Sequence, residues 1–81
     1  MRRHYLITYD IADDKRRTQV FDLLSDNGDH TQFSVFLCQL NREELAWVIG
    51  ALRYVVHTTE DQVLIVDLGK AYQDMELEIQ T

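Results

Sequence analysis

The residues of this sequence that are best placed to do chemistry are an aspartate that ends a predicted strand and two arginines that follow it. Asp10 ends the apolar and aromatic stretch of residues 5–9, so its carboxylate lies at the rim of a sheet and needs a partner. Arg17 falls in an early turn of the next predicted helix and can reach back toward Asp10. Arg16 points about 100° away around that helix and is expected to be exposed. An ordinary helix-initiating turn is the competing interpretation of Asp10.

The balance of charge restricts how the chain can meet nucleic acid. The sequence carries 8 basic and 14 acidic residues, a net charge of −6, so phosphate backbones repel it at long range. Any contact with nucleic acid must therefore be local. The basic residues do cluster, at Arg2 and Arg3 and again at Lys15, Arg16 and Arg17. A solvated helix face is the alternative explanation of the second cluster.

Length and composition indicate one small domain of a soluble protein. A chain of 81 residues holds only a thin core, so extra burial from a partner subunit is expected. No apolar run approaches the roughly 20 residues that span a bilayer, and no signal peptide is expected. Cys38 is the single cysteine and cannot form an internal disulfide, which agrees with a reducing compartment. The expected location is the cytoplasm.

Two helices are expected to hold these side chains in place, because apolar residues recur at helical spacing. The first helix follows an N-cap at Asp13 and stops at Gly28. The second follows a capping box formed by Asn41 and Glu44. Its apolar stripe consists of Leu45, Val48, Ile49, Leu52 and Val56.

Four stretches have the composition of strands. Residues 5–9 suit a strand that is covered on both faces of a sheet, and residues 62–68 are expected to form another buried strand. Residues 31–40 are apolar on both faces and form either one strand or two short ones. Residues 75–79 alternate apolar and polar side chains, as an edge strand does, and residues 69–74 would carry this strand to a partner's sheet. Two helices on one sheet face leave the other face bare, which favours face-to-face dimerisation.

Two separated motifs resemble one known family. TYDIADDKRR followed by GDHTQFSVFLCQL is similar to the strand-end YDI, the DDKRR helix start and the G-x-x-x-QYSVFEC segment of the CRISPR-associated protein 2 family. The resemblance covers residues 5–40 closely, and the order of elements follows through Leu68. It implies an α+β ferredoxin-like sandwich (βαββαβ) with an extra C-terminal strand, formed by residues 1–81 as one domain. It also implies a symmetric sheet-to-sheet homodimer, a C-terminal arm at 69–81 that pairs with the partner, and two short strands in 31–40.

The resemblance also implies a site. Asp10 matches an aspartate that faces its twin across the dimer axis and binds Mg²⁺ or Mn²⁺, and two such carboxylates repel unless they share a proton or a cation. Arg17 would then stabilise charge on a phosphodiester that is being cleaved. Ordinary core filling is the competing interpretation of the strand positions, and solvation that of the histidine. Further residues expected near the cleft or in contact with nucleic acid are Tyr9, Arg16, His30, Ser34 and Phe36.

Two functional classes follow from the resemblance. The first is a scaffold that bridges two CRISPR-associated integrase dimers and contacts DNA during the acquisition of new spacers. The second is a metal-dependent endonuclease that acts on RNA or DNA. The family often carries an arginine near His30, a glutamate at Leu37 and an acidic residue at Gln39, so the missing polar groups favour the scaffold. A VapD-like toxin endoribonuclease and a non-catalytic ferredoxin-like regulatory module remain as alternatives.

Overall fold

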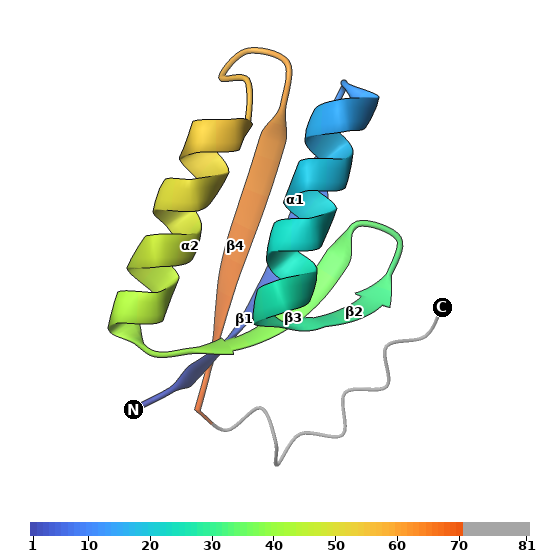
Figure 1. The fold of residues 1–81 in the computed structure, drawn as a ribbon. Coiled ribbons are helices and arrows are strands. Elements are labelled where there is room, and N and C mark those ends of the chain that lie inside the picture. Colours follow the sequence, from blue (N-terminus) through green and yellow to red (C-terminus); the bar gives the residue numbers. More distant parts are fainter. Residues whose placement is uncertain (71–81) are drawn as a thin grey trace.

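Four antiparallel strands form one sheet, and two helices cover one of its faces. The computed structural model describes residues 1–70. The sheet order is β2-β3-β1-β4, and both helices lie on the same side of it (Figure 1). This is the expected βαββαβ ferredoxin-like arrangement. The predicted C-terminal arm and strand lie almost entirely outside the described residues. The elements are β1 (Arg3–Asp10), α1 (Asp14–Asn27), β2 (Asp29–Gln32), β3 (Val35–Leu40), α2 (Arg42–Val55) and β4 (Gln62–Gly69).

Both helices begin where their capping residues predict, and α1 ends at its predicted stop. The Asp13 side chain accepts a hydrogen bond from the Arg16 N–H at 2.9 Å, which caps α1. Asn41 and Glu44 form the predicted capping box, with hydrogen bonds of 2.9 and 2.8 Å. Gly28 ends α1 and lies so close to β3 that a Cβ there would come within 2.4 Å of the Cys38 Sγ. Within residues 1–70, neither helix is long and apolar enough to cross a bilayer.

The predicted β run at 31–40 is two strands joined by a two-residue turn. Gln32 pairs with Val35, and Phe33 and Ser34 form the turn between them. Phe33 has φ +43°, a left-handed conformation that glycine or asparagine usually supplies. The sequence of this turn contains no residue typical of turns, so only the family resemblance predicted it.

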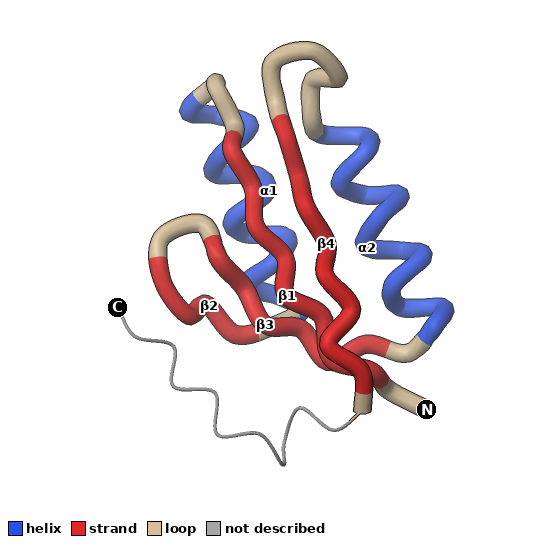
Figure 2. Tube along the Cα trace, turned by 180° about the vertical axis from the view of Figure 1, so that it is seen from behind, coloured by secondary structure: helices blue, strands red, loops and turns tan. Residues whose placement is uncertain are grey.

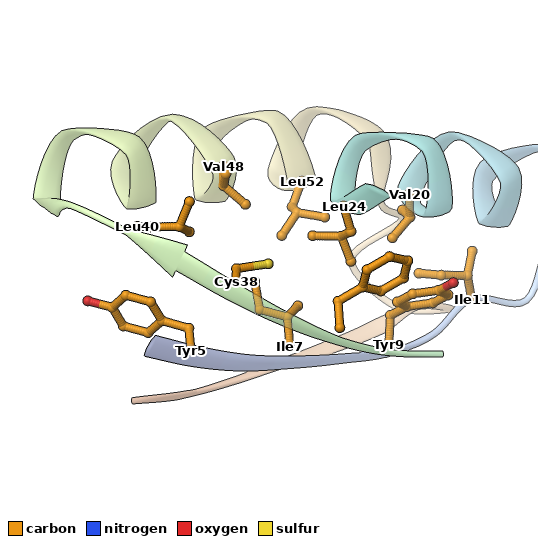
Figure 3. Packing of buried hydrophobic residues seen from close by; sticks show 11 residues of the cluster. Tyr5, Ile7, Tyr9, Ile11, Val20, Leu24, Cys38, Leu40, Val48 and Leu52 are labelled. Atoms are coloured by element: carbon orange, nitrogen blue, oxygen red, sulfur yellow. The ribbon is translucent and has the colours of Figure 1, made fainter. Parts of the chain in front are cut away.

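The core fills the space between the helices and the inner sheet face (Figure 3). Tyr5, Ile7 and Tyr9 point inward from β1, as strand alternation predicts. The helices contribute four buried side chains, two each from α1 and α2. These are Val20, Leu24, Val48 and Leu52.

Within one chain, the outer sheet face is not covered, although β1 and β4 were expected to form buried strands. Figure 2 shows this face, which neither helix covers. Leu6 and Thr8 are only half-buried there, and Leu64 and Val66 on β4 are 58% and 38% exposed. The strands are apolar on both faces, but the helices of the described chain cover only one. The remaining face is thus an unpartnered apolar surface.

A buried aspartate fastens the β1–α1 turn to the loop that precedes β4. The Asp61 carboxylate is fully buried and accepts hydrogen bonds from the Arg16 guanidinium at 2.8 and 3.1 Å. It also accepts from the backbone N–H groups of Ala12 at 3.0 Å and His57 at 2.8 Å. Arg16 in turn reaches Glu60 at 3.1 Å. The prediction that Arg16 is exposed is therefore wrong, because acceptors in a distant loop hold its side chain.

This fastening predicts acid sensitivity. The bound Arg16 guanidinium, helped by the two backbone donors, holds the pKa of Asp61 well below its usual range. A carboxyl whose pKa is lowered by folding stabilises the protein above its unfolded pKa, near 4, and loses that contribution as the pH falls. We expect Asp61→Asn to lower the melting temperature at pH 7 by roughly 5 °C or more. We also expect it to flatten the fall in stability between about pH 5 and pH 2.

Thermal unfolding followed by circular dichroism across this pH range checks the prediction. Asp26→Asn, an exposed aspartate at the end of α1, is the matched control and should leave the pH profile unchanged. Part of the acid sensitivity should survive in Asp61→Asn, because hydrogen bonds also lower the pKa values of Glu44 and Asp67. An unchanged profile in Asp61→Asn would contradict the proposed fastening.

Candidate functional site

Asp10 lies at the end of β1, where the outer sheet face meets its rim. Its Cα is paired in register with that of Gln62 on β4, and its side chain is exposed. Within residues 1–70 it forms no ion pair. It lines a surface hollow of about 240 Å³ together with Thr8, Tyr9, Ser34, Gln62 and Leu64. The carboxylate is thus presented beside the unpartnered apolar face.

Arg17 does not reach Asp10 but pairs with a nearer carboxylate. Its guanidinium donates to Asp14 Oδ1 at 2.5 and 2.7 Å, three residues earlier on α1. The partner is 95% exposed, and such surface pairs add little stability. The local i, i+3 spacing favours this pair over the expected reach to the strand end. The arginine can therefore exchange Asp14 for another anion at small cost.

Tyr9 and Ser34 connect the Asp10 hollow to a second one. Their backbones are joined by a Tyr9 N–H to Ser34 C=O hydrogen bond of 3.2 Å. Both residues also line a cleft of about 450 Å³ with Arg17, Thr18, Phe21 and Phe33. Burial raises the pKa of the Tyr9 phenol, and Arg17 partly opposes this shift. Two adjoining hollows, one acidic and one basic, thus share the same wall.

Phe36 and His30 lie behind this wall. Phe36 is completely buried, and its ring stacks on Tyr9 with centroids 6.3 Å apart. Its position is that of a supporting core residue. The exposed His30 ring contacts Phe36 and Phe21 at centroid distances of 4.9 and 5.1 Å. Since its Nε2 lies 2.5 Å from the Phe33 carbonyl oxygen, this nitrogen donates the hydrogen bond.

The structure therefore brings together only part of the predicted set. Tyr9 and Ser34 lie beside Asp10, Arg17 lies in the adjoining cleft, and Arg16 is turned away toward Asp61. Sequence reasoning missed Phe33, which is 85% exposed at the tip of the β2–β3 turn and lines the cleft. The available signal for Phe33 was the hairpin that the family resemblance implies within 31–40. A residue in the turn of a hairpin is usually exposed.

The described residues of one chain provide only part of the ligand set for a magnesium or manganese ion. Residues 1–70 contain no group of three or more histidine, cysteine, aspartate or glutamate side chains placed to hold a metal. Mg²⁺ needs few protein carboxylates, since it keeps several waters. Asp10 supplies one exposed carboxylate from each chain.

A family model and similar known proteins carry the same family description. A family model described as CRISPR associated protein Cas2 matches residues 1–76. A protein of Rhodospirillum rubrum named CRISPR-associated endoribonuclease Cas2 1 is 36% identical over 77 residues, which are 95% of this chain and 74% of that protein. A protein of Synechocystis with the same name is 45% identical over 70 residues, 82% of this chain and 74% of that one.

Solved structures agree. The crystal structure of Streptococcus pyogenes Cas2 at pH 6.5 matches with a TM-score of 0.79 and 29% identity, covering 88% of this chain and 92% of that chain. A hypothetical protein from Thermus thermophilus matches with a TM-score of 0.83 and 31% identity, covering 86% and 85%. The family match spans most of the sequence, and the fold and strand-end aspartate agree with the motifs that first suggested it. The chain belongs to the CRISPR-associated protein Cas2 family.

Proposed function

We propose that this protein is the dimeric subunit of a cytoplasmic spacer-acquisition complex, in which it bridges two integrase dimers and contacts DNA. The observation that carries the proposal is the apolar outer sheet face. This face is continuous across β3, β1 and β4, where Leu37, Leu6 and Val66 lie in one row and Val35, Thr8 and Leu64 in the next. A monomer of this size gains from covering such a surface, and a second copy supplies a matching one.

A symmetric dimer suits a bridging role because it presents every other surface twice. Two integrase dimers can then be held at equivalent sites on opposite ends of the assembly. Contact with DNA would be local, because the net charge of −6 opposes binding over a wide surface. Membership of the Cas2 family favours this CRISPR function over the toxin and regulator alternatives.

The bridging role predicts a ternary complex. Full-length protein incubated with the CRISPR-associated integrase from its own genome and a short duplex DNA should elute as one complex in size-exclusion chromatography with light scattering. The expected mass corresponds to one Cas2-family dimer and two integrase dimers. An integrase that co-elutes with DNA but never with this protein would contradict the bridging role.

Metal-dependent cleavage of nucleic acid is a second candidate function, favoured by Asp10. The carboxylate has no ion-pair partner within residues 1–70 and sits at the rim of the face proposed to dimerise. In a two-fold dimer it would meet its twin, and the pair would hold Mg²⁺ or Mn²⁺. The curated relatives described above carry the name endoribonuclease, so RNA is one expected substrate and DNA the other.

In this candidate function, different residues would have different roles in cleavage. Asp10 from each copy would hold the cation, which supplies Lewis-acid stabilisation of the scissile phosphate. Arg17, released from Asp14, would neutralise charge that develops on the phosphate oxygens. Ser34 and the ring of Tyr9 form the wall between these two side chains and would fix the path of the backbone.

A further inference from the structure

The cleft between α1 and the β2–β3 turn has the features of a binding site for one nucleotide. The turn lies beside α1 (Figure 1), and the cleft between them is lined by residues of β1, α1 and the turn. Its volume of about 450 Å³ is in the range of small-molecule sites. Of the described residues that line it, only Arg17 carries a charge. Arg17 is paired with Asp14, but that carboxylate is 95% exposed, so the pair adds little stability and a phosphate in the cleft can take its place.

Phe33 lies at the mouth of this cleft, in the two-residue turn between β2 and β3. Its side chain is 85% exposed, and its backbone has φ +43°. A bulky residue rarely adopts this conformation, and such outliers cluster at binding sites. The backbone is clamped on both sides of the turn. His30 donates to the Phe33 carbonyl, and the Ser34 carbonyl accepts from Tyr9. The ring is therefore presented to solvent on a fixed backbone.

We infer that the Phe33 cleft binds an unpaired nucleotide, whose base stacks on the Phe33 ring and whose phosphate pairs with Arg17. Aromatic faces bind bases by stacking, which requires a base with an open face, and a base inside a duplex has none. Phe21, 37% exposed on the opposite side, provides a second aromatic wall. The hydroxyl groups of Thr18 and Ser34 can accept or donate hydrogen bonds at the base edge, so little preference among bases is expected.

This inference rests on the proposed function, and it specifies which kind of nucleic acid the protein would bind. Since Tyr9 and Ser34 line both the cleft and the Asp10 hollow, the phosphate that Arg17 holds would lie on the wall that the cleft shares with Asp10. The ligand class is thus a nucleic acid with a single-stranded end or an unpaired base. The DNA and RNA forms share this chemistry.

The test compares two synthetic oligonucleotides of equal length, one single-stranded with internal 2-aminopurine and one fully paired. In the full-length protein, Phe33→Leu removes the ring and keeps an apolar side chain. We expect it to weaken binding of the single strand about 10-fold, to abolish the stacking quench of 2-aminopurine, and to leave duplex binding unchanged. Phe33→Tyr should bind as the wild type does. Phe33→Gly, which suits the positive φ, should fold and behave like Phe33→Leu.

The matched control is Tyr54→Leu, which removes another exposed aromatic ring, 92% exposed on α2. It should change neither affinity nor quenching. Equal losses for both oligonucleotides, or unchanged binding and quenching in Phe33→Leu, would overturn the inference. If the wild type assembles with integrase and duplex DNA while Phe33→Leu binds single strands normally, only the inference fails. If the wild type binds neither oligonucleotide and no integrase, the proposed function fails with it.

Discussion

Leu64→Lys is expected to separate the proposed homodimer into folded monomers. Leu64 is 58% exposed in one chain and lies on the outer face of the edge strand β4, in register with Thr8 of β1. In a two-fold dimer each substitution occurs twice, so two ammonium groups would enter an apolar interface and lose their water. The dissociation constant should rise by roughly 100-fold or more. The fold should survive, because the side chain makes no contribution to the inner core.

Sedimentation equilibrium over a range of protein concentrations measures this effect, and circular dichroism confirms that the variant is folded. Tyr54→Lys is the matched control, since it places the same charge on an exposed residue of α2, on the helical side of the sheet. It should leave the dissociation constant unchanged. A wild-type chain that stays monomeric at all concentrations, or a Leu64→Lys variant with wild-type dimer affinity, would refute sheet-to-sheet pairing.

Asp10→Asn is expected to remove metal-dependent cleavage while leaving the scaffold intact. The amide cannot replace a carboxylate as a hard anionic ligand, so each dimer would lose both of its proposed metal-binding groups. The cleavage rate with Mg²⁺ should fall by about 100-fold or more. Dimer affinity should stay the same or increase, because the substitution removes two like charges that would face each other.

The experiment follows cleavage of labelled single-stranded RNA and DNA with Mg²⁺, with Mn²⁺ and with a chelator. Asp22→Asn, an exposed acid on α1, is the control for the loss of one negative charge and should cleave as the wild type does. Cleavage that persists at the wild-type rate in Asp10→Asn would remove Asp10 from any catalytic role. Integrase binding measured on the same preparations would show whether the scaffold role stands without cleavage.

The sequence by itself determined most of the secondary structure. Asp13, Asn41 and Glu44 were recognisable as caps because capping uses side chains within three residues of the backbone groups that they satisfy. The inward faces of β1 and α2 followed from strand and helix periodicity. Asp10 was placed at a strand end for the same reason. The family motifs added the order of elements and the hairpin, which local turn chemistry did not reveal.

Only the tertiary structure decided how the charged and aromatic side chains are used. Asp61 meets Arg16 across 45 residues of sequence, and no local pattern encodes that contact. The same contact turned Arg16 inward, while Arg17 found a nearer partner in Asp14. Phe33 reads as a buried strand residue in sequence, yet the register of β2 with β3 places it in a turn. Periodicity specifies which way a side chain points from its own element, whereas its partners depend on how distant elements pack.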